Sequence, residues 1–291
     1  MPCLVLSFGN ESRVPVLGTV VSLLQTGIIS PVGHYKKSMT IENEEDLEKL
    51  RIIGRIVFET LMLMKRHLQV GITTKQLDRI GQQNLERYGA RSAPILMYDF
   101  PGHTCISINN EAAHGIPSER KVGAGDVVNI DVSAELSGYF GDTGATFTVP
   151  PVDPRIEYLC QVTRKSLKDA MKAARSGAKV SQIGQAIERT ARQSGFTTIK
   201  DLGSHGIGRS LHEEPHFIPN FNDRKENRVL HEGQVITIEP FISTGSESTI
   251  TADDGWTLLT EDGNFSAQYE YTMVITRDHP IVLTTLKNQA A

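Results

Sequence analysis

Four carboxylates of this 291-residue chain lie in or beside strongly apolar stretches. Asp131 follows Val-Val-Asn-Ile, and Asp142 follows Gly-Tyr-Phe-Gly. Glu239 follows Val-Ile-Thr-Ile, and Glu270 precedes Tyr-Thr-Met-Val-Ile. A carboxylate is seldom buried in such surroundings unless it is paired or bound to a metal ion. The pattern therefore favours a cation-binding site over four separate acids on a solvated surface.

Asp131 and Asp142 are predicted to face each other across a β-hairpin. The midpoint between them falls after Leu136, beside Ser137-Gly138, which are typical turn residues. Directly opposed residues in an antiparallel pair have Cβ atoms ~5 Å apart on one face. Like charges at that separation repel each other, and a divalent cation between them removes the penalty.

Glu239 and Glu270 are predicted to form a second pair of the same kind. Their midpoint falls at Asp254-Gly255, a strong turn dipeptide. The polar stretch 243–251 interrupts the strand pattern, so this register has less support from the sequence than the first one.

Three histidines lie between or near these carboxylates. The segment from His205 to His212 contains two glycines, which favours a strand or loop over a helix. His114 lies in a turn-like Ala-Ala-His-Gly-Ile-Pro segment shortly before the first hairpin. Each histidine alone would more often be structural, and its position among the carboxylates gives it a functional interpretation. Four others lack such a context and are interpreted as ordinary polar residues: His103, His216, His231 and His279.

Four carboxylates with one or two histidines form an oxygen-rich set of metal ligands. Such a set suits Mn²⁺, Fe²⁺, Co²⁺ or a catalytic Zn²⁺ pair better than structural zinc. Two ions ~3.5–4 Å apart can share a hydroxide and polarise a carbonyl group. The three cysteines, Cys3, Cys105 and Cys160, lack CxxC spacing, which favours a reduced, cytoplasmic protein over a thiolate zinc site.

Composition indicates a globular protein, because 39% of the residues are hydrophobic. The formal net charge is −4 and no stretch approaches a basic stripe, so no sequence-specific nucleic-acid partner is expected. The apolar segment 14–30 is shorter than the ~20 residues of a membrane span, and no convincing cleavage site follows it. We predict a poorly ordered or dispensable extension over 1–38 and a catalytic domain over 39–291.

Helical periodicity predicts long and short helices in alternation, over 42–69, 74–88, 156–174 and 181–194. Thr73 or Thr74 is the expected cap of the second helix, and Gly89 its stop signal. Four pairs recur at one constant offset: Gly71/Gly177, Gln76/Gln182, Leu77/Ile183 and Gly89/Gly195. Chance similarity of two capped helices is one interpretation, and two related halves is the favoured one.

Strand-like segments follow each pair of helices. They cover 105–108, 126–134 and 139–149 in the first half, and 234–241, 268–276 and 281–284 in the second. Helices grouped in sequence and followed by hairpins predict an α+β fold, with helices packed outside antiparallel sheet. A site between two such halves would take ligands from both.

The chain resembles the type I methionine aminopeptidases over about residues 40–286. The resemblance rests on six motifs in the family's order: Ser-Ile-Asn-Asn-Glu-Ala-Ala-His114-Gly-Ile-Pro, Val-Asn-Ile-Asp131-Val, Gly-Asp142-Thr, His205-Gly-Ile-Gly to His212-Glu-Glu-Pro, Ile-Glu239-Pro and Gln-Tyr-Glu270-Tyr-Thr. It implies the pita-bread fold, whose two pseudosymmetric halves agree with the repeat. It also implies removal of the initiator methionine from new proteins when the second residue is small.

By this resemblance two divalent ions, Co, Mn, Fe(II) or Zn, have the ligands Asp131, Asp142, His205, Glu239 and Glu270. Asp142 and Glu270 would bridge the ions, and Asp131 would bind one of them bidentately. Glu239 would also move a proton from the bridging water to the leaving amine.

The resemblance further implies that His114 and His212 hold the scissile peptide and stabilise the tetrahedral intermediate. The partners would be N-terminal methionine peptides of nascent proteins, with transient ribosome association. A monomer with no membrane partner is expected.

The match to the family is looser at the methionine pocket. Its expected residues are Cys105, Phe100, Trp256, Met97 and Leu211. Met97, Tyr98 and Leu211 stand where better-known enzymes have tyrosine, histidine and phenylalanine, and Pro94 where many have cysteine. Tyr271 replaces the more usual histidine after Glu270, which bears on hydrogen bonding around the metal ligands.

The short interval between His212 and Glu239 leaves no room for the insertion of type II enzymes. The extension also lacks the Cys/His pattern of eukaryotic type I forms, so the bacterial style remains. An X-Pro aminopeptidase of the same fold is a second hypothesis, although such enzymes carry a large N-terminal domain. A metal-free binding module is a third, although such relatives have generally lost ligands.

Overall fold

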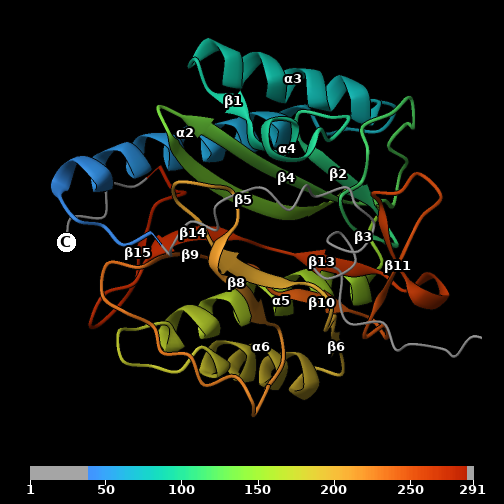
Figure 1. Ribbon diagram of the computed structural model, residues 1–291. Coiled ribbons are helices and arrows are strands. Elements are labelled where there is room, and N and C mark those ends of the chain that lie inside the picture. Colours follow the sequence, from blue (N-terminus) through green and yellow to red (C-terminus); the bar gives the residue numbers. More distant parts are fainter. Residues whose placement is uncertain (1–38, 287–291) are drawn as a thin grey trace, which may run out of the picture. The chain divides into compact units, whose positions relative to one another are not determined.

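The computed structural model describes residues 39–286, in which helices cover antiparallel sheets (Figure 1). The predicted extension over 1–38 lies outside these residues. The helices are α2 (Glu44–His67), α3 (Thr74–Arg87), α4 (Ala93–Tyr98), α5 (Pro154–Ala173), α6 (Ser181–Gln193) and the 3₁₀ turn η1 (Glu261–Gly263). The strands are β1 (Arg91–Ser92), β2 (Cys105–Ile108), β3 (Glu111–Ala113), β4 (Val127–Leu136), β5 (Tyr139–Thr148), β6 (Thr197–Thr198), β7 (Gly203–Gly206), β8 (Glu213–Pro219), β9 (Val235–Ile238), β10 (Phe241–Ser243), β11 (Thr249–Thr251), β12 (Leu258–Thr260), β13 (Ser266–Gln268), β14 (Tyr271–Val274) and β15 (Ile281–Val282).

The four long helices begin and end close to where the sequence predicts. The side chain of Asn43 caps α2 by accepting a hydrogen bond from the Asp46 backbone N–H. Thr73 caps α3 in a reciprocal capping box with Gln76. None of the helices within 39–286 has the length and apolar character needed to traverse a bilayer.

Corresponding backbone hydrogen bonds confirm the two related halves. Gly71 N–H donates to Val122 at 2.8 Å, and Gly177 N–H donates to Leu230 at 2.9 Å. All four glycines of the repeat have a positive φ, between 71° and 90°, which an L-residue adopts only with strain. Chance similarity of two helices would not reproduce these long-range contacts.

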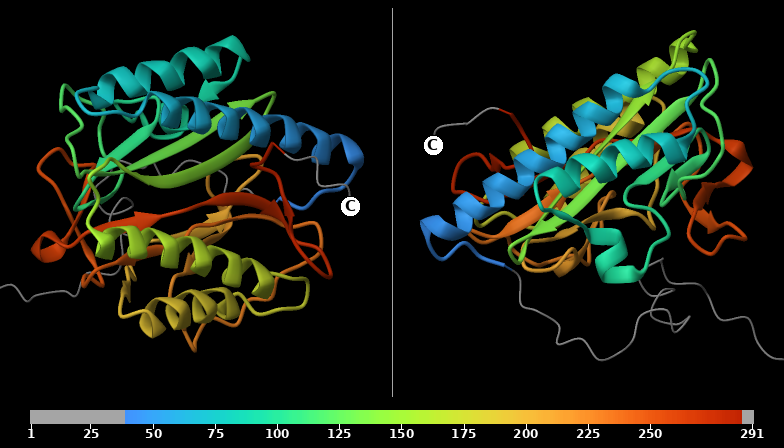
Figure 2. Two further views of the ribbon diagram at one scale, coloured as in Figure 1. Left: turned by 180° about the vertical axis from the view of Figure 1, so that it is seen from behind. Right: turned by 90° about the horizontal axis from the view of Figure 1, so that it is seen from above.

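A hydrophobic core lies beneath each pair of helices, and the second half also contributes Val235 and Val274 to the first core. The first core lies under α2 and α3 and includes residues of β2, β4 and β5. The second lies under α5 and α6 and includes residues of β9 and β14. Figure 2 shows the blue and teal helices on one side of the strands and the yellow-green and olive helices on the other. The predicted α+β arrangement is confirmed.

The first hairpin is formed, but its predicted register is wrong by two residues. Asp131 pairs with Gly144, and Asp142 pairs with Ser133. The two-residue turn is Ser137-Gly138, with φ of 54° and 82°, so its centre lies after Ser137 instead of before it. A shift of two residues keeps both carboxylates on one face, because side chains alternate with a period of two.

The second predicted register is confirmed, although the hairpin is interrupted. Tyr271 pairs with Ile238, Gln268 with Phe241, and Thr260 with Thr249, which all share one centre. That centre is the turn at Asp254-Gly255, where Gly255 has a φ of 78°. Glu239 and Glu270 therefore flank the paired ends of β9 and β14.

Candidate metal centre

Strands from both halves position the five predicted metal ligands. Asp131 lies in β4, Asp142 in β5 and His205 in β7. Glu239 comes directly after β9, and Glu270 directly before β14. The first half thus supplies Asp131 and Asp142, and the second half supplies the other three residues.

Hydrogen bonds join the two halves at the site itself. The Asp142 N–H donates to the hydroxyl of Thr272 at 3.0 Å, and that hydroxyl donates to the Asp142 carbonyl at 2.7 Å. The hydroxyl of Thr143 donates to the Glu270 carbonyl at 2.9 Å. The backbones of the two acidic segments are thus fixed relative to each other.

The five side chains converge. One ligand atom from each of Asp142, His205 and Glu270 lies within 4.8 Å of the other two. His205 Nε2 lies 3.5 Å from Glu239 Oε1, and the Asp131 carboxyl hydrogen bonds that of Asp142. Except for Asp131, which is half-buried, all are at most 7% exposed.

Burial and mutual repulsion disfavour charge on these carboxyl groups. Burial, together with the neighbouring acids, raises the pKa of Asp131, Glu239 and Glu270 well above its usual range. The pKa of Asp142 rises to about 6, mainly through burial. Burial lowers the pKa of His205 to about 4, so its neutral imidazole can act as a ligand.

Two buried oxygen atoms in the cluster accept no hydrogen bond from the described residues. They are Asp142 Oδ1 and Glu270 Oε1. A buried acceptor without a partner is uncommon and calls for an explanation. A divalent cation supplies one, because it would neutralise the cluster and occupy these lone pairs. The oxygen-rich donor set with one imidazole fits a hard divalent metal ion.

His212 and His114 lie beside the cluster. The His212 ring is 4.1 Å from the His205 ring, and its Nδ1 is hydrogen bonded to the Tyr98 hydroxyl. His212 is exposed on one side, and protein surrounds the rest of its ring. This desolvation, with His205 and His114 nearby, holds the pKa of His212 well below its usual range. His114 has a φ of 55°, and burial lowers its pKa to about 4.

The structure brings together only part of the predicted methionine pocket. Phe100 and Trp256 form an edge-to-face pair with ring centres 5.2 Å apart. Cys105 pairs with Asp131 across the β2–β4 ladder, so its thiol lies beside the acidic cluster. Met97 is 38% exposed on α4, and Leu211 belongs to the core of the first half. A role for Met97 and Leu211 in the pocket stays a prediction.

Two buried amide side chains next to the cluster were not predicted from the sequence. Gln268 Nε2 donates to Glu270 Oε2 at 3.1 Å, and Asn129 Nδ2 donates to Gln268 Oε1 at 2.8 Å. Asn129 precedes Asp131 by two residues, and Gln268 precedes Glu270 by two. Side chains two residues apart lie on the same face of a strand. This spacing from Asp131 and Glu270 is the sequence signal that could have identified Asn129 and Gln268.

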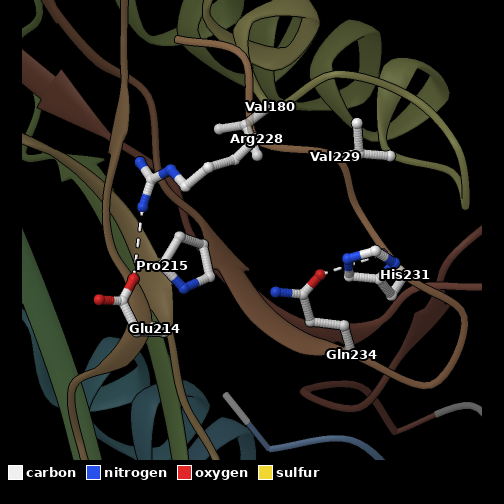
Figure 3. A pocket seen from close by; sticks show the side chains of 7 residues that line it. All are labelled: Val180, Glu214, Pro215, Arg228, Val229, His231 and Gln234. Carbon is white, nitrogen blue, oxygen red and sulfur yellow. Dashed lines mark hydrogen bonds and ion pairs between the residues drawn. The ribbon is translucent and has the colours of Figure 1, made fainter. Parts of the chain in front are cut away.

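A separate cavity of about 330 Å³ contains none of the predicted site residues. It lies by the start of α6, and Figure 3 shows the ion pair between Arg228 and Glu214 at one end of it. The two atoms of this pair are 3.4 Å apart. Because none of the predicted site residues lines this cavity, the carboxylate–histidine cluster is the candidate functional site.

Two pseudosymmetric α+β halves around a buried carboxylate–histidine cluster define a class of metal-dependent hydrolases. The chain belongs to metallopeptidase family M24, whose family model matches residues 48–277. It is 49% identical over 249 residues to methionine aminopeptidase 2 of Bacillus subtilis (strain 168), which covers 85% of this chain and 100% of the relative. It is 39% identical over 259 residues to methionine aminopeptidase of Aquifex aeolicus (strain VF5), with the same two coverages.

Solved structures agree with the family assignment. The crystal structure of methionine aminopeptidase from Rickettsia prowazekii has a TM-score of 0.81 and 36% identity, over 85% of this chain and 100% of that one. A prolidase from Pyrococcus furiosus has a TM-score of 0.68 and 21% identity, over 86% of this chain and 66% of that one. The second likeness concerns the fold alone. The expected pita-bread fold is confirmed.

Proposed function

We propose that this protein is a methionine aminopeptidase that hydrolytically removes the initiator methionine from new proteins when the second residue is small. The observation that carries the proposal is the convergence of all five predicted ligands in a chain that spans whole methionine aminopeptidases at up to 49% identity. The X-Pro alternative has less support, because the prolidase likeness is 21% identical and covers 66% of that chain.

Asp131, Asp142, His205, Glu239 and Glu270 would hold two divalent ions, Co, Mn, Fe(II) or Zn. Among these proposed ligands, Asp142 and Glu270 carry the two buried oxygens without a partner, so their lone pairs would be available to the ions. His205 and Glu239, which lie 3.5 Å apart, would belong to one ion, and Asp131 to the other. When bound, the metal pair would supply a nucleophilic hydroxide and polarise the scissile carbonyl.

The remaining steps belong to side chains of this protein. Glu239 would accept a proton from the attacking water and pass it to the leaving amine. His114 and His212 would bind the scissile peptide and stabilise the oxyanion, because neutral imidazoles can donate a hydrogen bond to it. The low pKa of both histidines supports that neutral form.

The methionine side chain of the substrate would occupy a pocket beside the cluster. The paired rings of Phe100 and Trp256 and the thiol of Cys105 supply apolar and polarisable surface there. Met97 and Leu211 would complete the pocket. The departures from the family at Met97, Tyr98, Leu211 and Pro94 affect substrate preference more than chemistry, because the ligand set is complete.

The partners would be N-terminal methionine peptides of nascent proteins, reached by transient association of a cytoplasmic monomer with the ribosome. The groove between α5 and α6, about 300 Å³ in volume, supports this association through the exposed cations Arg175 and Arg189, whereas its Lys172 is paired with Asp169 at 3.1 Å. Such side chains attract the phosphate backbone of RNA without reading its sequence. Reversing Arg175 and Arg189 to glutamate should weaken sedimentation with ribosomes and leave peptide hydrolysis unchanged.

The proposed activity is tested by hydrolysis of Met-Ala-Ser after chelation and after readdition of individual metals. We expect chelation to abolish turnover and one or more of the four metals to restore it. Preferential cleavage of an Ala-Pro peptide would favour the X-Pro hypothesis. If the purified protein contains no metal and cleaves neither peptide after addition of any of the four metals, a binding module would be favoured.

A further inference from the structure

Gln268 lies beside Glu270 and Glu239, the two predicted ligands that flank β9 and β14. Its amide Nε2 donates to Glu270 Oε2 at 3.1 Å, and its side chain also lies close to the Glu239 carboxyl group. The residue is 1% exposed, so this amide has little access to water. One neutral group is therefore bonded to Glu270 and lies close to Glu239, two carboxylates that would otherwise repel each other.

Asn129 determines which end of the Gln268 amide faces the carboxylates. Asn129 Nδ2 donates to Gln268 Oε1 at 2.8 Å and to the Thr146 hydroxyl at 3.3 Å. Because an amide nitrogen only donates, Gln268 must present its oxygen to Asn129. Its NH₂ group then faces Glu270 and Glu239, with no freedom to turn over.

The backbone around Gln268 is shaped to receive this side chain. A Cβ atom on Gly144 would lie 2.3 Å from Gln268 Oε1 and 2.6 Å from its Nε2, so only glycine leaves room there. The Thr146 hydroxyl accepts from the Gln268 N–H and donates to its carbonyl, both at 2.9 Å. The position of the amide is thus fixed from two sides.

We propose that Gln268 is a positioning residue for the metal centre, which selects the oxygen that Glu270 offers to the ion. Its amide occupies Glu270 Oε2, and this leaves Oε1 as the buried oxygen without a partner. The same amide lies close to Glu239, and its bond to Glu270 holds that proposed ligand in place before the ion arrives. The inference rests on the proposed metal-dependent function, and it assigns Gln268 no direct contact with substrate.

The proposal is tested by titrating metal-stripped full-length protein with Mn²⁺ in a calorimeter. Losing a group that orients a metal ligand typically costs about 10–100-fold in metal affinity. We expect Gln268→Met to raise the Kd for Mn²⁺ by about that factor. At saturating Mn²⁺ the kcat for Met-Ala-Ser should recover most of its wild-type value, since every ligand is still present. A purely structural defect would not be reversed by metal.

Asn129→Asp provides a second variant in case Gln268→Met does not fold. An aspartate there accepts hydrogen bonds, so it would turn the amide over and point its oxygen at Glu270. We expect weaker Mn²⁺ binding, and a double variant no weaker than Gln268→Met alone, because both changes act through one amide. Asn84→Leu, which removes a remote amide bond to Thr60, is the matched control with unchanged affinity.

The outcomes separate this inference from the proposed function. Wild-type Mn²⁺ affinity in folded Gln268→Met, or in Asn129→Asp, would overturn the positioning role. Wild-type protein that binds no Mn²⁺, Co²⁺, Fe²⁺ or Zn²⁺ would overturn the metal-dependent function, and the positioning role with it. Tight metal binding without cleavage of Met-Ala-Ser would overturn the aminopeptidase activity and leave the role of Gln268 standing.

Discussion

At the scale of single residues, Asp142 and Glu270 stand out as buried acids whose unpartnered oxygens face a cluster of like charge. Asp142→Asn or Glu270→Gln removes one carboxylate of the proposed ligand set. We expect each variant to lose bound metal and activity together. Elemental analysis and Met-Ala-Ser turnover measure the two losses, and full turnover in Asp142→Asn would show that the bridging assignment is wrong.

His212 gives a contrasting prediction, because its ring lies 4.1 Å from that of His205 and we assign it to substrate binding and not to the metal. His212→Ala removes a donor to the developing oxyanion, a change that typically lowers kcat by about 10²–10³-fold. Metal content should stay at the wild-type level. Loss of the metal in this variant would instead place His212 among the ligands.

Tyr98 supplies a third residue-scale prediction through its hydrogen bond to His212 Nδ1. Tyr98→Phe keeps the ring contact and removes the hydroxyl, whose net contribution is about 1 kcal/mol. We expect kcat to fall about fivefold with KM nearly unchanged, because the imidazole is less well oriented. Tyr88→Phe, which loses a surface bond to Glu59, is the matched control. Equal kinetics in wild type and Tyr98→Phe would remove Tyr98 from the catalytic machinery.

At the scale of elements, the sequence predicted the long helices and strands well because their periodicity and caps are local signals. It predicted the register of Glu239 and Glu270 because the turn at Asp254-Gly255 is specific. It missed the register of the first hairpin by two residues, since Ser137-Gly138 is compatible with either centre and only the twist of the paired strands decides. The contacts of Gln268 could not be predicted, because its partner Asn129 comes from the other half.

The close approach of α2 to the strand segments gives a prediction at the same scale. A Cβ atom on Gly54 would lie 2.6 Å from the carbonyl oxygen of Leu283, which is backbone and cannot move aside easily. Gly54→Ala should therefore destabilise the protein by about 1–3 kcal/mol, despite the better helix propensity of alanine. The matched variant Gly81→Ala should cost less, since the nearest atom is the flexible Met64 Sδ at 2.8 Å. Thermal unfolding compares the two, and equal Tm values would contradict the steric argument.

At the scale of the whole molecule, the site exists only where the two halves meet. Asp131 and Asp142 come from the first half, and His205, Glu239 and Glu270 from the second, so neither half holds the complete set of proposed ligands. The repeat of helices and glycines was visible in the sequence, whereas the pairing of the halves is not a local property. The family resemblance supplied that long-range information. The hydrogen bonds that Gly71 and Gly177 both make to distant residues support the relation between the two halves.

The predicted domain boundary at residue 39 divides the chain into an extension and a catalytic domain. All five proposed ligands lie within 39–286, so we expect deletion of residues 1–38 to leave metal content, kcat and Tm unchanged. Met39 should remain, because its N–H donates to the buried Glu213 carboxylate at 2.8 Å and its carbonyl accepts from Val235 at 3.1 Å.

A deletion that continues through Ile41 provides the matched comparison. It removes the contact with Glu213, the bridge between Thr40 and Gln234, and the bond from Ile41 N–H to the Gly233 carbonyl at 2.8 Å. These bonds hold the start of the chain against the segment that leads into β9, and β9 ends next to Glu239. We therefore expect the longer deletion to lower Tm and metal affinity while the shorter one changes neither. Loss of activity on deleting residues 1–38 alone would make that extension part of the enzyme and place the boundary elsewhere.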